Sequence, residues 1–261
     1  SNPRVREEFQ KWAVHMRDTY HVDAFRLDTA AYIGRGALEE LQHVVGIPIL
    51  GEVTTANATH LALYTREAGH RVLAGALNFP AAYSARVAFC GLPGREHDPA
   101  TGMRYNTDFP DPSLGSLANM TLLASVLRQQ FEGMSNTYTS LDLLGNFLDN
   151  HGDPFNRLAS QCSGSKARIS NALAWLLLFR GMPVLYYGTE QGMKGLYPGS
   201  SGMSVRSSMW QYHLDRTTWQ YKFLSKLNHL RRKLNLGQAE ASVVHADMKT
   251  MVFTREKGQS V

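Results

Sequence analysis

The sequence lacks the features typical of membrane, metal-binding and nucleotide-binding proteins. No apolar run approaches the roughly 20 residues of a membrane span, and the longest, residues 172–179, suits a buried helix. The two cysteines, Cys90 and Cys162, show no Cys-X-X-Cys or Cys/His metal spacing; they could pair in a secreted protein or stay buried as thiols. Neither GxGxxG nor GxxxxGK followed by Ser or Thr comes after an expected strand, which argues against an open nucleotide-binding fold.

The chain also begins without an initiator methionine or a signal peptide, and a helical pattern starts almost at once. We therefore expect a segment cut from a longer protein; its compartment stays open, with a secreted or extracellular one favoured. The formal charge of +5 comes from 27 basic and 22 acidic residues spread along the chain. The one dense basic cluster, residues 231–233, is interpreted as a solvated helix C-terminus rather than a nucleic-acid patch, so no nucleic-acid partner is expected.

What the sequence does contain is a regular alternation of strands and helices. Hydrophobic residues at 43% and charged residues at 19% fit a globular protein with a sizeable core. Apolar runs near residues 25, 50, 75, 146 and 186 predict strands, and helical patterns lie between them. This order predicts an α/β fold whose parallel sheet is covered by helices, either as a barrel or as an open sheet.

The same patterns predict further elements. We expect a helix over residues 56–69, a strand over 71–79 and a further strand over 182–190. Residues 91–113 are rich in glycine and proline and predict an irregular surface excursion. The tail, residues 241–256, changes to short β-rich stretches around polar turns, which predict the start of an antiparallel unit.

Carboxylates follow three of the expected strands. Asp28 and Glu52 end the first two strands, and Asp149 and Asp153 follow the strand near residue 146. Because the C-terminal ends of parallel strands lie on one face, these side chains should converge on one pocket. A single carboxylate at a strand end is often only a helix cap, but three in nearby units, with basic side chains beside them, favour a site.

Close carboxylates suit glycosidic bond cleavage. Burial and like charge separate their pKa values, so that one ionised Asp can attack an anomeric carbon while a protonated Glu donates to the leaving oxygen. Arg26 precedes Asp28 by two residues and points to the same side of the strand, where it would keep Asp28 ionised. Arg26 could equally be a structural ion-pair partner, and the two interpretations are compatible.

Four segments in order resemble the α-amylase family of glycoside hydrolases. Three resemble signature segments of that family: FRLDTA (25–30), GEV (51–53) and FLDNH (147–151). A fourth, MPVLYYGTEQG (182–192), is similar to the family's eighth barrel strand, and residues 2–12 resemble the helix before its fourth strand. The resemblance implies a (β/α)8 TIM barrel, cleavage of α-glucosidic bonds with retention, and a C-terminal β domain.

On this resemblance the chain lacks the first three barrel strands. Residues 1–236 would be a partial barrel containing strands four to eight, and residues 237–261 the start of the antiparallel C-terminal β domain. The motifs would make Asp28 the nucleophile and Glu52 the acid/base. The remaining side chains carried over to the site would contact the nucleophile or sugar hydroxyls: Arg26, Asn150, His151 and Asp153.

The chain departs from the family at its third acid. The family reads Asn-His-Asp, whereas this sequence reads Asn150-His151-Gly152-Asp153. Without a gap, Gly152 replaces the acid and the protein would turn over slowly or not at all. With Gly152 as an insertion that takes up positive φ, Asp153 fills the role; this alignment is preferred because residues 156–158 resemble the family's continuation.

A second departure concerns calcium and the leaving-side sugar. Where the family often has Lys-His after the nucleophile, this chain has Ala31 and Tyr32. Calcium is therefore possible in the full-length protein but unsupported by this sequence, and no metal ligand is assigned. Tyr32 could stack on a sugar ring or simply pack.

The leading hypothesis is a retaining glycoside hydrolase that acts on α-linked glucans or oligosaccharides. A transglycosylase or isomerase would use the same carboxylates, and a catalytically silent amylase-like protein that binds glycans or a partner is the alternative from another class. Substrate length and linkage are left open by the sequence.

Overall fold

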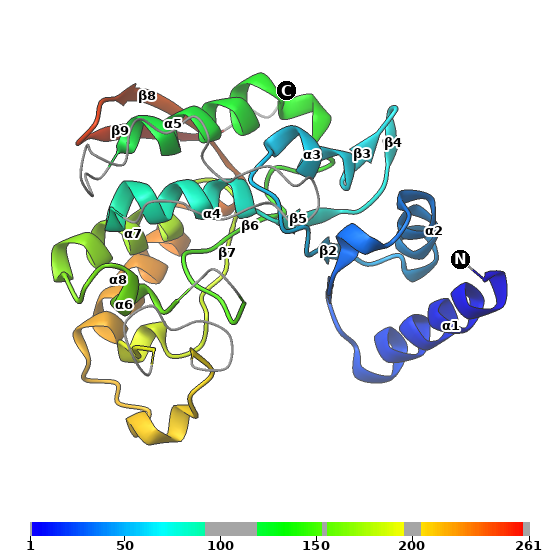
Figure 1. Cartoon of the computed structure of the whole chain (residues 1–261), viewed down its shortest axis with the longest axis horizontal. Helices are drawn as coiled ribbons and strands as arrows, with labels where there is room; N and C mark the ends of the chain where they lie inside the picture. Colours follow the sequence, from blue (N-terminus) through cyan, green and yellow to red (C-terminus); the bar gives the residue numbers. More distant parts are fainter. Residues whose placement is uncertain (1, 92–118, 153–155, 196–204, 258–261) are drawn as a thin grey trace.

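The computed structural model describes residues 2–91, 119–152, 156–195 and 205–257. Its centre is a sheet of five parallel strands in the order β1-β2-β5-β6-β7 (Figure 1). The strands are β1 (Phe25–Leu27), β2 (Ile49–Gly51), β5 (Gly75–Leu77), β6 (Leu144–Asn146) and β7 (Met182–Pro183). Within the described residues the sheet does not close into a barrel, because β1 and β7 each pair on one side only.

Helices follow the strands and cover the sheet. Figure 1 shows α1 and α2 together beside the β1–β2 end of the sheet, and α7 and α8 grouped beyond its other end. The helices are α1 (Pro3–Tyr20), α2 (Arg35–Val45), α3 (Ala58–Leu63), α4 (Phe79–Ala85), α5 (Met120–Arg128), α6 (Leu158–Gln161), α7 (Lys166–Leu178) and α8 (Trp219–Lys233). No helix within the described ranges is long and apolar enough to cross a membrane.

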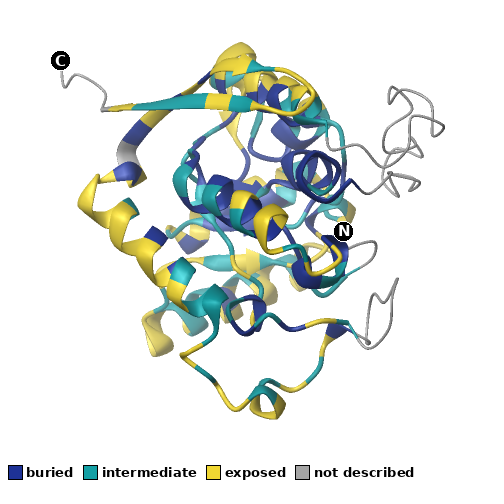
Figure 2. Ribbon diagram, turned by 90° about the vertical axis from the view of Figure 1, so that its left-hand side faces the viewer, coloured by how far each residue is buried: buried dark blue, intermediate teal, exposed yellow. Residues whose placement is uncertain are grey.

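The core lies between these helices and the sheet, where buried residues concentrate (Figure 2). The strands are short, and the two inner strands β2 and β6 are buried throughout, as expected where helices cover a parallel sheet, whereas Arg26 in β1 is exposed. Close packing also explains Gly75, since a Cβ there would collide with the backbone oxygen of Leu143. Large aliphatic side chains with 0% exposure form the centre: Leu38, Leu61, Leu73, Leu123, Leu127, Leu144 and Leu173.

The expected alternation of strands and helices is found, but the helix over 56–69 is wrong in its second half. The helix α3 ends at Leu63, and a small antiparallel hairpin follows, made of β3 (Arg66–Glu67) and β4 (His70–Arg71). Its turn places Ala68 and Gly69 at φ +47 and +86. Two consecutive positive φ values suit a tight hairpin turn and end any helix.

Two expected strands are also shorter than the sequence indicates. Of the strand predicted over 71–79, only β5 joins the sheet, and it ends before Asn78 because that side chain accepts a hydrogen bond from the Ala81 amide and starts α4. The strand predicted over 182–190 contains only β7 in the sheet. The predicted excursion at 91–113 lies outside the described residues except for its first residue.

The C-terminal segment contains the expected antiparallel unit. Strands β8 (Ala239–Ala246) and β9 (Met251–Lys257) pair with a register irregularity after Val243. They pack against α5 (Figure 1). Whether residues 237–261 begin a separate domain stays a prediction.

The basic cluster at 231–233 is only partly the solvated helix end that the sequence predicts. Arg231 is partly buried and donates hydrogen bonds to the backbone oxygens of Leu177, Phe179 and Gly181, at 2.7, 3.3 and 2.9 Å. It therefore satisfies carbonyls at the end of α7. Arg232 and Lys233 are exposed.

Candidate active site

The parallel pairing of β1 and β2 brings Asp28 and Glu52 together. Leu27 lies opposite Gly51 in the register, and the Glu52 amide donates to the Leu27 oxygen at 2.8 Å. Each carboxylate is the next residue after its strand, so both emerge at the same sheet edge. The Thr29 amide donates to Glu52 Oε2 at 3.2 Å, which fixes that carboxyl beside the β1 end.

Arg26 bridges the two acids. Its Nη2 lies 2.5 Å from Glu52 Oε1, and its Nη1 lies 3.4 Å from Asp28 Oδ1. One guanidinium thus orients both carboxyls. The ion-pair and site-orienting interpretations of Arg26 therefore describe the same contacts.

The environment separates the pKa values of the two acids. Hydrogen bonding from Glu52 and the nearby Arg26 charge lower the pKa of Asp28, although slight burial opposes them. Burial, and then the hydrogen bond to Asp28, raise the pKa of Glu52. Exposure explains the contrast: the Asp28 side chain is 70% exposed and that of Glu52 14%. The pair therefore favours one ionised and one protonated carboxyl.

His151 lies beside this pair, on the loop that follows β6. Its pKa is lowered by burial and by the charges of Arg206 and Arg26, while the charge of Asp28 raises it. The His151 imidazole is therefore close enough to Asp28 and Arg26 for their charges to affect its pKa. Asn150 uses its side-chain oxygen within the loop, where it accepts a hydrogen bond from the Gly152 amide at 2.8 Å.

The other sequence-predicted site residues have different outcomes. Asp153 lies outside the described residues, so its role stays a prediction. Gly152 does not adopt a positive φ, so the conformation expected of it is wrong. Tyr32 is 74% exposed and lines a surface hollow of about 470 Å³ together with Arg35, Tyr64 and others, so its ring is available to a ligand rather than packed in the core.

Asp149 belongs to the buried support of the loop and not to the open site. It is 3% exposed, and its Oδ2 accepts hydrogen bonds from the Leu158 amide at 2.9 Å and the Thr189 hydroxyl at 2.8 Å. Burial raises its pKa to about 6, against the hydrogen bonds and the charge of Arg157. The sequence predicted Asp149 as one of the acids of the site, and no pattern in the sequence indicated that its side chain is buried.

The raised pKa of Asp149 predicts a pH-dependent stability. Because the folded pKa of about 6 exceeds the ordinary 3.8, the folded state holds the proton more tightly, and its full contribution is present below pH 3.8. We expect the free energy of unfolding to lose about 3 kcal/mol as pH rises from about 4 to above 6. Urea unfolding at several pH values would measure this loss as the difference between the parent and Asp149→Asn.

Asp149→Asn keeps an oxygen for Leu158 and Thr189 but cannot titrate, so its stability should change less across this interval. Asp23→Asn is the matched control, because Asp23 is exposed. Parallel pH profiles for the parent and Asp149→Asn would contradict the prediction.

Sequence reasoning missed two arginines next to the site. The Arg206 guanidinium donates to the His151 backbone oxygen, with nitrogen–oxygen distances of 3.3 and 3.4 Å. Arg157 is fully buried behind the same loop. Only Arg157 stood in a segment with a recognisable pattern, and nothing in the sequence distinguished Arg206 from other surface arginines.

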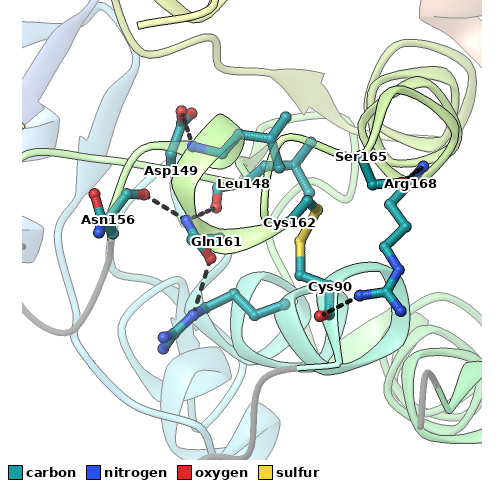
Figure 3. Close-up of a disulfide and its surroundings, with 10 residues drawn as sticks. Cys90, Leu148, Asp149, Asn156, Gln161, Cys162, Ser165 and Arg168 are labelled. Carbon is teal, nitrogen blue, oxygen red and sulfur yellow. Dashed lines mark hydrogen bonds between the residues drawn. A yellow bond between two sulfur atoms is a disulfide. The ribbon is translucent and has the colours of Figure 1, made fainter. Parts of the chain in front are cut away.

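The two cysteines form a disulfide next to α6, the helix that follows the loop carrying His151. Cys90 and Cys162 are joined across a sequence separation of 72 residues (Figure 3), which decides between the two states that the sequence left open. Next to Cys162, the Gln161 Nε2 donates to the Leu148 oxygen at 3.1 Å and the Asn156 oxygen at 2.5 Å. Both ends of the loop that carries His151 are therefore held by α6.

No calcium ligands are assigned in this chain. In the part of the chain that the structure describes, no group of three or more His, Cys, Asp or Glu side chains could hold a metal ion. Ala31 and Tyr32, which stand where the family often has Lys-His, add no carboxylate or imidazole.

Paired carboxyls at the C-terminal ends of neighbouring strands in a parallel α/β sheet are the arrangement that carboxylate-based cleavage of a glycosidic bond would need. The family profile "Alpha amylase, catalytic domain" matches residues 1–234. The chain belongs to the α-amylase family of glycoside hydrolases.

Curated relatives include yeast amylases. The chain is 27% identical over 225 residues to alpha-amylase 2 of Schwanniomyces occidentalis, covering 86% of this chain and 36% of that protein. It is 26% identical over 227 residues to an alpha-amylase of Saccharomycopsis fibuligera, covering 87% and 38%. The chain thus spans between a third and two-fifths of the length of these relatives.

Two solved α-amylases have the same fold. An alpha-amylase of Malbranchea cinnamomea superposes with a TM-score of 0.78 at 22% identity, covering 97% of this chain and 47% of that one. The alpha-amylase of Geobacillus thermoleovorans, solved with acarbose, gives 0.75 at 20% identity, covering 99% and 51%. The five parallel strands are therefore part of the TIM-barrel fold of the α-amylase catalytic domain.

Proposed function

We propose that the protein is a retaining glycoside hydrolase that cleaves α-glucosidic bonds in α-glucans or oligosaccharides. The observation that carries the proposal is the Asp28–Glu52 pair, bridged by Arg26 and separated in pKa at one sheet edge. The acarbose bound by the Geobacillus relative supports an α-glucan-type ligand.

The chemistry needs both protonation states that the site favours. Asp28, ionised, attacks the anomeric carbon and forms a glycosyl-enzyme as the bond to the leaving oxygen breaks. Glu52 gives its proton to that oxygen, and then removes a proton from the water that hydrolyses the glycosyl-enzyme and releases Asp28. Two inversions at the same carbon give net retention.

The remaining candidates position the sugar. His151 and Asn150 lie on the loop beside the pair, and Asp153 is assigned the third acid role on the preferred alignment. Tyr32 lies exposed after β1, and its ring is assigned to stacking on a sugar. Residues 1–236 would supply strands four to eight of the barrel, and the rest of the sheet would come from outside the chain.

Hydrolysis of p-nitrophenyl α-maltoside by the full-length protein tests the proposal. We expect release of p-nitrophenol, and NMR of the first product should show the α-anomer before mutarotation. Appearance of the β-anomer first would contradict retention. No turnover with sugar binding intact would instead favour the silent glycan-binding alternative, to which Gly152 points.

An acceptor experiment separates hydrolase from transglycosylase. Because both share the glycosyl-enzyme, they differ in whether water or a sugar hydroxyl attacks it. Added maltose that raises p-nitrophenol release while forming longer oligosaccharides would identify the transglycosylase alternative.

A further inference from the structure

Arg157 is a buried arginine that the proposed reaction does not use. It directly precedes α6, it is 0% exposed, and its Nη1 donates to the Tyr187 backbone oxygen. Its Nε and Nη2 are buried and have no hydrogen-bond partner among the residues that the structure describes. Because a buried cation with unsatisfied donors costs free energy, something else must compensate this side chain.

Two tyrosine rings contribute to that compensation, in addition to the charge of buried Asp149, which interacts with that of Arg157. The guanidinium carbon lies 4.2 Å from the ring centroid of Tyr186 and 4.5 Å from that of Tyr187. The two rings meet edge to face, with centroids 4.7 Å apart and an interplanar angle of 68°. A cation on an aromatic face is attracted by the ring quadrupole, and more strongly where water is excluded. Arg157 therefore holds both rings at a defined angle.

One of these rings leads to the site. The Tyr186 ring faces the His151 imidazole, with centroids 6.4 Å apart and the planes tilted by 43°. The charges of Arg26 and Asp28 in turn affect the pKa of His151. Contacts thus run from the buried guanidinium through Tyr186 to the imidazole beside the carboxylate pair.

The same two loops are joined a second time without Arg157. The Asp149 carboxylate, after β6, accepts a hydrogen bond from the Thr189 hydroxyl, after β7. The Tyr187 hydroxyl also donates to the Ser207 oxygen at 3.1 Å. Loss of the guanidinium should therefore disturb the ring positions more than the attachment of the loops.

We propose that Arg157 is a positioning residue for the candidate active site, in which its guanidinium fixes the Tyr186 and Tyr187 rings and Tyr186 fixes the His151 imidazole. The role of His151 in binding a sugar rests on the proposed function. The claim that Tyr186 holds the His151 imidazole in place does not depend on it.

Two readouts on Arg157→Met test the proposal. The first is an NMR titration of the His151 ring, with the signal assigned by comparison with His151→Gln, which reports the environment of the imidazole. The second is kcat and KM for p-nitrophenyl α-maltoside, which report the effect on catalysis. We expect the His151 ring to titrate at higher pH than in the parent, because the loss of Tyr186 packing reduces its burial. We expect kcat/KM to fall on the order of 10²-fold, since small misplacements at a reacting centre have such effects.

Arg231→Met is the matched control, because Arg231 is a partly buried arginine that also donates to backbone oxygens but caps α7. It should lower the melting temperature and leave both His151 readouts unchanged. A His151 titration in Arg157→Met equal to that of the parent would overturn the proposal, whatever the loss of stability.

Arg157→Lys covers the case in which the methionine variant does not fold. Lysine keeps the charge but has no planar group to lie over two rings. Its His151 should therefore still titrate above the parent value, and a parent-like titration would overturn the proposal. Because the NMR readout needs no turnover, an inactive parent would count against the proposed function and leave this test valid.

Discussion

Asp28→Asn is expected to lower kcat on the order of 10⁴-fold or more, the scale seen when a nucleophile is removed. The amide cannot attack the anomeric carbon, whereas the lowered pKa of Asp28, caused by its Glu52 and Arg26 contacts, favours the ionised carboxylate that the proposed attack requires. The loss should be similar for glucans and for substrates with good leaving groups, because glycosyl-enzyme formation needs the carboxylate in both. Steady-state rates on maltoheptaose and α-maltosyl fluoride measure it.

The control for this variant is Asp23→Asn. Asp23 is exposed and precedes β1, at the opposite end of the strand from Asp28, so its loss should leave kcat unchanged. Because the Asp28 side chain is 70% exposed, the melting temperature of Asp28→Asn should stay near that of the parent. Retention of a tenth or more of parent kcat would exclude Asp28 as the nucleophile.

Glu52→Gln should give a loss that depends on the leaving group. For a glucan, whose leaving oxygen needs a proton, we expect kcat/KM to fall about 10²–10⁴-fold. For α-maltosyl fluoride the first step needs less help from an acid, so its kcat/KM should fall far less. The glycosyl-enzyme should then accumulate, since no base activates water, and a burst of fluoride release would report it.

The pH profile adds an independent check on Glu52. Burial raises the pKa of Glu52. The protonated form of Glu52 should therefore be lost as pH rises through this raised pKa, and kcat/KM of the parent should fall with it. Activity should also fall at low pH, as Asp28 becomes protonated at its lowered pKa. The alkaline limb should disappear in Glu52→Gln.

Glu8→Gln serves as the matched control, because the Glu8 side chain on α1 is 64% exposed and far along the chain from both acids. It should leave the rates on both substrates and the pH profile unchanged. Equal losses on glucan and fluoride in Glu52→Gln would argue that Glu52 is not the acid.

Several elements could be predicted from the sequence because local pattern decides them. The helices α1, α5, α7 and α8 show in their hydrophobic periodicity, and the five strands show as short apolar runs. The meeting of Asp28 and Glu52 was also predictable, because parallel neighbouring strands end at one edge and each acid directly follows its strand. The hairpin after α3 was missed because its turn is formed by Ala68 and Gly69, both at positive φ. Glycine is common at positive φ, but alanine is not, so the pair does not resemble a hairpin turn in the sequence.

By itself the sequence determined which chemical groups follow which strands, because apolar runs and residue order are local properties. Only the tertiary structure decided what those groups are able to do. Burial and charge from distant segments set protonation: Glu52 is shielded and Asp28 is not, although both follow short strands of the same kind. The same holds for Asp149, whose carboxyl is buried against Thr189 from forty residues away. Desolvation depends on the packing of the whole chain, and no spacing along the sequence records it.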